Sequence, residues 1–158
     1  MPLSHPIRAY LLVFTLDRQR YALRLDRVQR VVRAAAVTPL PKAPEVVLGI
    51  LDLGGQVVPV INLRRRFRLP ERELRSDDQF VVAKAGALTV ALAVDAAGEV
   101  LEEGELELVP PESVVAGTAF LEGVAATREG LLLIHDLESL LFPSEERQLS
   151  QALAEGGG

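Results

Sequence analysis

The feature that most constrains the fold of this chain is an internal repeat. Residues 49–63 read GILDLGGQVVPVINL and residues 123–137 read GVAATREGLLLIHDL, so they align without gaps at a shift of 74 residues. A second pair, residues 12–32 and 81–101, precedes it at a shift of 69 residues and places Asp26 over Asp95. The shift lies outside the usual range of solenoid repeats. Two pairs in the same order therefore indicate a duplicated small domain.

The local pattern within each repeat is that of short strands. Gly54-Gly55 predicts a tight hairpin turn, and Pro59 in the strand that follows predicts an edge position or a bulge. Three prolines within residues 37–44 predict an extended connection. Apolar alternation and β-rich composition predict strands over residues 10–16, 21–25, 28–32, 46–53, 56–61, 80–85, 88–94, 99–101, 120–127 and 131–135. Ten strands in two sets of about five favour an all-β fold of two small barrels.

Helices are expected only at the ends of the two repeats. Short helical turns are predicted over residues 63–69 and 136–141, the second capped by Asp136. Ser144, followed by two glutamates, predicts a terminal helix that stops before Gly156. The polar run of residues 70–78 then divides the chain into a first barrel (8–75), a second barrel (76–142) and a C-terminal helix and tail (143–158).

Charge is divided unevenly between these parts. The chain carries a net charge of −5, made up of +8 over residues 1–75 and −13 over residues 76–158. Opposite charges of this kind can attract each other within one molecule, or join molecules head to tail. Ordinary solvated surface charge explains the same pattern, and the sequence leaves all three explanations open.

The sequence lacks the motifs of an enzyme. It contains two histidines, His5 and His135, and the side chains of His135 and Asp136 point to opposite faces if both lie on one strand. No nucleophile elbow, phosphate-binding loop, dinucleotide fingerprint or cluster of metal ligands occurs. There is no cysteine, no signal peptide pattern and no apolar run of the ~20 residues that span a bilayer. We therefore expect a cytoplasmic, non-catalytic protein without metal or cofactor.

The basic run of residues 64–68 raises a separate hypothesis. Clustered arginines can neutralise phosphates, which is typical of nucleic-acid binding. The acidic total and an aromatic content of 4% are against it, because a single-strand binder needs a stacking platform. The prediction is that nucleic acid is not a partner.

Several short pieces together resemble the CheW family, the adaptors that couple chemoreceptors to the histidine kinase CheA. The resemblance extends from about Tyr10 to Leu141, and its specific signal is the order and spacing of the pieces. The pieces are Val28-Gln29, Pro41-x-x-Pro44-x-x-Val47-x-Gly49, Gly55-x-x-x-Pro59-x-x-Asn62-Leu63-Arg64, Val94-Asp95 and Phe120-Leu121-x-Gly123.

The resemblance implies one CheW-like domain of two five-stranded barrels of the Src-homology-3 kind, packed along a shared apolar seam and lacking an active site. The N-terminal strand of such a domain can complete the second barrel. In the family, the first barrel contacts the regulatory domain of CheA, and a groove near the seam takes the tip of the receptor's helical hairpin. Carried over by position, the residues near these partner surfaces are Val28, Arg30, Gly49, Asp52 and Gly54.

Two departures from the family pattern concern these residues. The family commonly has Glu after Val-Gln, where this chain has Arg30, and Asn-Leu-Arg-Gly in the hairpin turn, where this chain has Asp52-Leu53-Gly54-Gly55. One hypothesis is that Asp52 pairs with Arg30, which restores an ion pair of reversed polarity. The alternative function is a divergent module that binds a single partner, associates with itself head to tail, or serves another system such as pilus-based motility.

Overall fold

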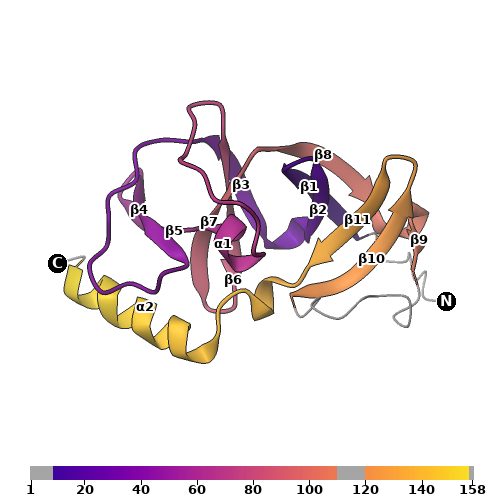
Figure 1. Cartoon of the computed structure of the whole chain (residues 1–158). Helices are drawn as coiled ribbons and strands as arrows, with labels where there is room; N and C mark the ends of the chain where they lie inside the picture. The colour runs from indigo at the N-terminus through magenta and orange to yellow at the C-terminus, as the bar shows by residue number, and fades with distance from the viewer. Residues whose placement is uncertain (1–8, 110–119, 157–158) are drawn as a thin grey trace.

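A computed structural model describes residues 9–109 and 120–156, and these residues form two β-sheets side by side (Figure 1). The predicted all-β fold is confirmed, whereas His5 and the Pro110-Pro111 loop lie outside the described residues. The first sheet has six strands in the order β8-β1-β2-β11-β10-β9, one more than predicted because the two-residue strand β9 is added. The second sheet has five strands in the order β3-β6-β7-β5-β4.

The strand boundaries follow the predicted ones closely. The first sheet contains β1 (Tyr10–Leu16), β2 (Gln19–Arg24), β8 (Ala96–Glu102), β9 (Glu107–Leu108), β10 (Leu121–Thr127) and β11 (Gly130–His135). The second sheet contains β3 (Val28–Arg33), β4 (Val47–Leu53), β5 (Gln56–Ile61), β6 (Gln79–Ala85) and β7 (Leu88–Val94).

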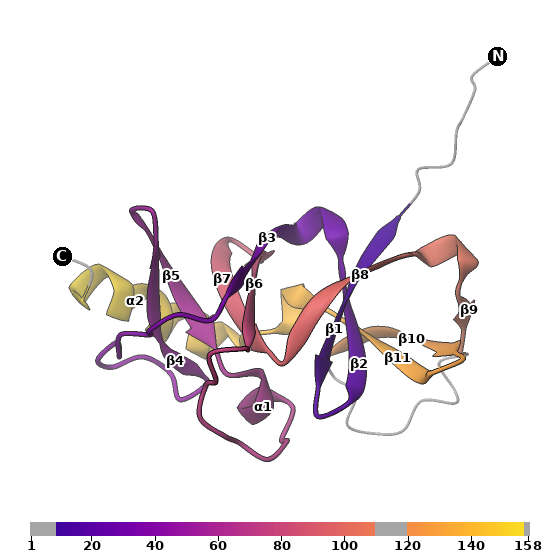
Figure 2. The same ribbon diagram turned by 90° about the horizontal axis from the view of Figure 1, so that it is seen from above.

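Both sheets combine strands from both repeats. The hairpin β1–β2 pairs with β8 and β11 of the second repeat, while β6–β7 pairs with β3 and β5 of the first. The chain crosses between the sheets right after β2, where the three-residue 3₁₀ turn η1 (Leu25–Arg27) leads into β3 (Figure 2). The predicted division into barrels at residues 8–75 and 76–142 therefore does not separate the sheets, because the first two strands of each repeat lie in the sheet that holds the later strands of the other repeat.

The structure preserves the repeat down to its irregularities. The β1–β2 register, in which Leu11 faces Arg24, recurs at a shift of 69 residues in β6–β7. The register slips between Val28 and Arg30 on β3 and at the equivalent place on β8. A second pair of slips falls between Val47 and Gly49 on β4 and at the equivalent place on β10. Matching bulges in matching places show that the two repeats share one backbone plan.

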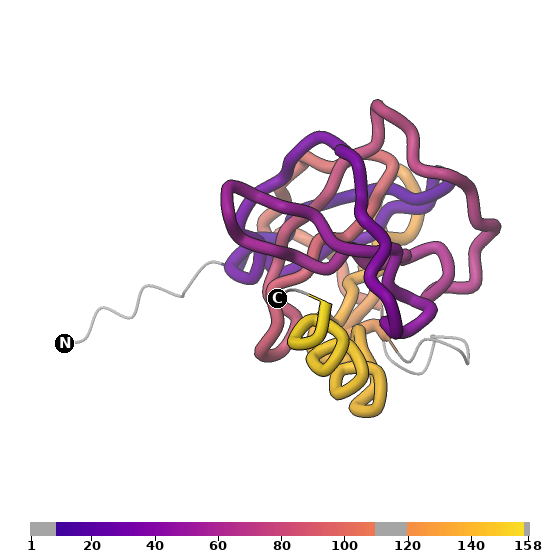
Figure 3. The backbone as a smooth tube through the Cα atoms, turned by 90° about the vertical axis from the view of Figure 1, so that its left-hand side faces the viewer, coloured from indigo at the N-terminus to yellow at the C-terminus, as the bar shows by residue number. Residues whose placement is uncertain are grey.

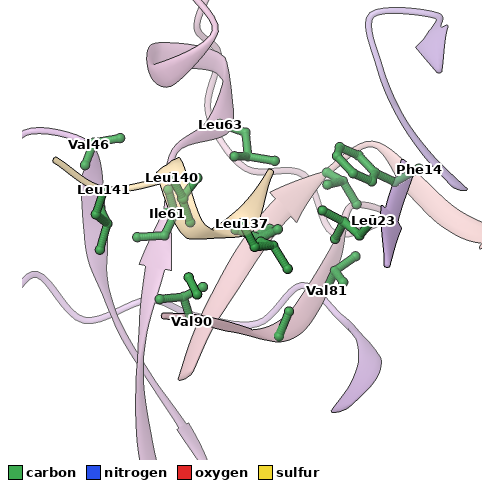
Figure 4. Packing of buried hydrophobic residues seen from close by; sticks show 14 of the residues in the cluster. Phe14, Leu23, Val46, Ile61, Leu63, Val81, Val90, Leu137, Leu140 and Leu141 are labelled. Carbon is green, nitrogen blue, oxygen red and sulfur yellow. The ribbon is translucent and has the colours of Figure 1, made fainter. Parts of the chain in front are cut away.

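Three hydrophobic clusters explain why the central strands are apolar on both faces. Leu11 and Val13 point into a cluster inside the first sheet, whereas Leu12 and Phe14 point into a larger cluster between the sheets. The same alternation on β6 sends Phe80 and Val82 into a third cluster inside the second sheet. Figure 4 shows side chains from both sheets meeting in the central cluster. This cluster is the shared apolar seam that the family resemblance implied.

Proline in β5 does not mark an edge strand, because β5 lies between β4 and β7. Pro59 faces Ile50 on β4, and the pairing of β5 with β7 runs only through Val60 and Ile61. Pro59 thus lies just beyond the segment in which a donor toward β7 is needed, so its missing N–H costs the sheet nothing.

The helices are shorter than predicted at the repeat ends. Helix α1 spans Leu63–Arg66 and stops because Arg68 adopts a positive φ of 59°. The segment over 136–141 contains only the 3₁₀ turn η4 (Leu137–Ser139), with Asp136 as its N-cap. Helix α2 spans Pro143–Gly156 and runs along the outside of the sheets (Figure 3). Its buried side chains Leu149 and Ala152 join the central cluster.

Candidate partner-binding face

The five residues predicted to face partners all belong to the second sheet. Val28 and Arg30 lie on β3, which is one edge of that sheet. Gly49 and Asp52 lie on β4, the opposite edge, and Gly54 lies in the turn between β4 and β5. The structure thus brings Asp52 and Gly54 together in one hairpin and places Val28 and Arg30 on a different strand.

Gly49 is required by the fold itself. Its φ is +152°, and a Cβ added to it would lie 2.3 Å from the carbonyl oxygen of Thr38. Thr38 bridges β4 by two backbone hydrogen bonds with Ile50, of 3.0 and 2.7 Å. The close approach that a glycine permits is therefore made by the chain's own backbone.

The hypothesised pair between Asp52 and Arg30 is not formed. Asp52 Oδ1 instead accepts a hydrogen bond of 2.8 Å from the Gly55 amide, which stabilises the hairpin turn. The strands that carry Asp52 and Arg30 lie at opposite edges of the sheet, with three strands between them in the hydrogen-bonding order. The polarity reversal relative to the family therefore leaves two separate exposed charges.

The outer surface of the β4–β5 hairpin is partly apolar. Leu48 is 38% exposed and Val57 is 47% exposed, and Val57 faces Asp52 across the two strands. On the other edge, Arg30 is also exposed. Exposed aliphatic side chains beside an exposed charge are a common feature of protein-binding surfaces.

Ion pairs within the molecule account for much of the charge asymmetry. Arg24 on β2 pairs with Glu103 and Glu122, and Arg20 pairs with Glu99 at 2.6 Å and with Glu129 at 3.2 Å. Most ion pairs in the described part of the chain likewise join a base from residues 1–75 to an acid from residues 76–158. The two oppositely charged halves thus attract each other inside one molecule.

The basic run of residues 64–68 is also engaged internally. Arg66 is almost buried, donates to Glu145 of α2 at 2.5 Å and stacks on the ring of Phe142. Arg65 pairs with Glu45 and with Glu71. Two of the four arginines in the run are thus paired with carboxylates of the same molecule, whereas Arg68 is exposed. Pairing of this kind weakens the nucleic-acid hypothesis, because fewer guanidinium groups are left to neutralise phosphates.

Arg64, the first residue of the run, belongs to a charged network at the seam. It donates to Asp17 in the β1–β2 turn at 2.8 Å and to Asp95 at 2.7 Å. Arg72 from the segment between α1 and β6 donates to the same Asp95 oxygen at 2.7 Å and to both oxygens of Asp78 at 2.8 Å. The network ties together four segments that are distant in the sequence.

The network shifts the acidity of its carboxylates. Hydrogen bonds from Arg72 lower the pKa of Asp78, and the effect of burial opposes them. Burial also disfavours the charged form of Asp95, but the Asp17 amide and the Arg64 guanidinium together hold the pKa of Asp95 below its ordinary value. The repeat had already aligned Asp95 with Asp26, but no local pattern in the sequence indicated that Arg72 and Asp78 would join it.

His135 is a buried residue of the central packing. It is 1% exposed, and its ring lies 5.0 Å from the ring of Phe67. It occupies the place in the second repeat that the buried Ile61 occupies in the first. Burial lowers the pKa of His135 to about 4, so the ring is neutral near pH 7.

Two further observations apply to residues 9–109 and 120–156 only. Within them, no group of three or more His, Asp or Glu side chains is placed to hold a metal ion. Neither of the α-helices there combines the length and the apolar character that crossing a bilayer requires.

Comparisons with known proteins agree with this architecture. The chain is similar to chemotaxis protein CheW of Klebsiella aerogenes, with 30% identity over 90% of this chain and 87% of the relative. It is also similar to chemotaxis protein CheW of Treponema pallidum, with 29% identity over 87% of this chain and 84% of the relative. The crystal structure of the scaffolding protein TtCheW from Thermoanaerobacter tengcongensis superposes with a TM-score of 0.75 at 32% identity, covering 88% of this chain and 96% of that one. A sequence model of the CheW-like domain matches residues 10–144, and the chain therefore belongs to the CheW-like family.

Proposed function

We propose that this chain is a non-catalytic adaptor that couples chemoreceptors to a CheA-type histidine kinase in bacterial chemosensory signalling. The observation that carries the proposal is the family match over residues 10–144, which includes every strand of both sheets. The similarity to a scaffolding protein at a TM-score of 0.75 supports the same role. An adaptor of this kind works in the cytoplasm, where the kinase and the receptor tips are found.

The second sheet supplies the proposed docking face. Its β4–β5 hairpin presents Leu48 and Val57 beside Asp52 and Gly54, and its other edge presents Arg30, next to the half-buried Val28 that packs against the central cluster. We assign these edges to the regulatory domain of the kinase and to the cytoplasmic tip of the receptor. Gly49 contributes indirectly, because the absence of a side chain lets β4 lie close to the backbone of Thr38.

The test is binding of the full chain to the regulatory domain of the histidine kinase encoded nearest to it, with and without the receptor tip. We expect saturable binding to the kinase domain and a ternary complex when both partners are present. Arg30→Ala should weaken binding about tenfold, which corresponds to ~1.4 kcal/mol. Arg128→Ala is the matched control, because Arg128 is an equally exposed arginine in the β10–β11 turn of the other sheet. A folded chain that binds neither partner would contradict the proposal.

A CheW-like module that binds a single partner is the second candidate, and the loss of the family's usual charge pair favours it. Such a module would bind the kinase domain or the receptor tip, but the ternary complex would not form. Head-to-tail self-association is a weaker variant, because the attraction between the two charged halves is largely satisfied inside the molecule. Sedimentation at low and high salt would detect it as a salt-sensitive rise in mass.

A further inference from the structure

The repeat creates two equivalent hollows, one in each half of the molecule. The filled hollow is lined by Leu48, Arg64, Arg72, Asp78 and Asp95. The open hollow is lined by Arg24, Asp26, Arg27, Glu122, His135 and Glu138, and its volume is about 180 Å³, against about 80 Å³ for the filled hollow. At the two repeat shifts Asp95 corresponds to Asp26, Leu48 to Glu122 and Arg64 to Glu138.

The filled hollow shows how this site holds a guanidinium group. Arg72 reaches back over it and donates to Asp95 at 2.7 Å and to Asp78 at 2.8 Å. It arrives there because the chain, after α1, loops back through residues 67–78 before it enters β6. The occupant of the filled hollow is thus an arginine side chain supplied by the chain's own linker.

Among the described residues, no arginine from the segment that follows Glu138 reaches the open hollow, and its own Arg24 and Arg27 pair with carboxylates other than Asp26. After Glu138 the chain continues into α2, whose residues Gln148 and Glu155 contact Lys42 instead of turning back. Asp26, the counterpart of Asp95, forms neither a hydrogen bond nor an ion pair with any described residue. The second hollow therefore has the carboxylate that corresponds to Asp95, but it lacks an arginine that pairs with this carboxylate as Arg72 pairs with Asp95.

The charge of the open hollow suits a cation. Its lining includes four carboxylates, on Asp26, Glu122, Asp136 and Glu138, against two guanidinium groups. Both guanidiniums are already engaged: Arg24 pairs with Glu103 and Glu122, and Arg27 donates to Glu138 at 2.6 Å. The hollow therefore keeps an excess of negative charge after its internal pairs are formed.

A second, independent feature of the hollow is an unsatisfied acceptor. His135 lines the hollow, its side chain is buried, and neither of its ring nitrogens has a hydrogen-bond partner. A neutral imidazole has one nitrogen that accepts a hydrogen bond. Buried polar atoms without partners are rare in native proteins, and one at a ligand site is explained by the donor that the ligand brings.

We propose that the open hollow binds an arginine side chain presented by a partner protein, with Asp26 in the role that Asp95 plays toward Arg72. The guanidinium would pair with Asp26 and come close to Glu138, and its N–H groups would supply the donor that His135 lacks. The partner is thus recognised by a basic side chain at this hollow, on the opposite half of the molecule from the β4–β5 hairpin. This inference does not rest on the coupling role.

The test uses N-acetyl-L-argininamide as the probe and the full chain, isotope-labelled for NMR. We expect saturable shifts of the amide signals of residues 24–27 and 135–138, together with the ring signals of His135. N-acetyl-L-citrullinamide has nearly the same shape and no charge, and it should leave these signals in place. Because the probe contains no part of a kinase or receptor, its failure would leave the coupling role standing.

Two variants make the result decisive. Asp26→Asn should weaken the binding of N-acetyl-L-argininamide about tenfold, since a charge-assisted pair is replaced by a neutral contact. Glu105→Gln removes the same charge from an exposed site outside the hollow and should leave the affinity unchanged. Both variants are expected to fold, because both side chains are exposed. Equal binding of the citrulline compound, or equal loss from both variants, would overturn the proposal.

Discussion

The two hollows are formed by equivalent backbone segments, but their side chains carry different charges. In the first, Arg64 and Arg72 converge on Asp95, and the site is closed by the chain itself. In the second, Glu138 stands where Arg64 stands in the first, and Asp26 has no ion-pair partner in the described part of the chain. Duplication thus copied the strands, bulges and caps, whereas a few side chains decided which copy became a structural lock and which stayed accessible. Surfaces for partners can arise in this way, by leaving one copy of an internal contact incomplete.

The comparison is tested most severely at the two glycines next to the equivalent bulges. Gly49→Ala should destabilise the protein by about 4 kcal/mol, because the backbone is strained for a side chain and Thr38 leaves no room. Gly123→Ala should cost less than about 1 kcal/mol, since its Cβ would meet Ile134 at an ordinary 3.7 Å. Urea denaturation of both variants measures the difference in the free energy of unfolding. Similar losses of stability would show that the contact between Gly49 and the Thr38 backbone does not distinguish the two bulges.

The next test compares Arg64 with its counterpart Glu138. Arg64→Met should cost about 3 kcal/mol, because it leaves Asp95 and Asp17 with fewer donors in a partly buried network. Glu138→Met should cost no more than about 1 kcal/mol, because its pair with Arg27 is exposed on both sides. If denaturant unfolding shows equal losses of stability for both variants, the network in the filled hollow does not stabilise the fold more than the exposed pair does.

The smallest effect concerns the pH dependence of stability at His135, the position that is equivalent to Ile61 of the first repeat. The unfolded chain binds a proton at His135 near pH 6.5, but the folded protein binds it only near pH 4, so unfolding takes up a proton between these values. Stability should therefore fall as the pH is lowered through this window, by about 2 kcal/mol between pH 7 and pH 5. His135→Ile, which places the residue of the first repeat at this position, should remove this part of the dependence of stability on pH. A variant with the full wild-type slope would place the titrating group elsewhere.

Much of the fold was readable from local pattern. The runs around Leu12 and Val81 predicted strands because neighbouring side chains are apolar, and the structure buries them alternately in the two clusters on either side of each sheet. The turn at Gly54-Gly55 and the cap at Asp136 were predicted for the same local reason. The sheet partners of β3 and β8 were not predicted, because pairing depends on which distant hairpin offers an edge.

The candidate site was predictable only in part. Position within the family motif pointed to the edges of the second sheet, but it also suggested a pair between Asp52 and Arg30 that is not formed, because the Asp52 carboxylate accepts from the Gly55 amide instead. The network around Asp95 was missed, since Arg72 and Asp78 lie in a segment that reads as a polar linker. Spacing in the sequence does not report contacts that a folded loop makes with a distant turn.

The sequence by itself determined the duplication, the all-β class, the strand positions and the family, because each of these is written in local composition or in order along the chain. The tertiary structure alone decided that the first hairpins of the two repeats are exchanged, that bases of residues 1–75 pair with acids of residues 76–158, and which hollow is left open. These properties depend on three-dimensional proximity: the free energy of a buried ion pair such as Arg64–Asp95 exists only after the strands that carry its two ends have been brought together.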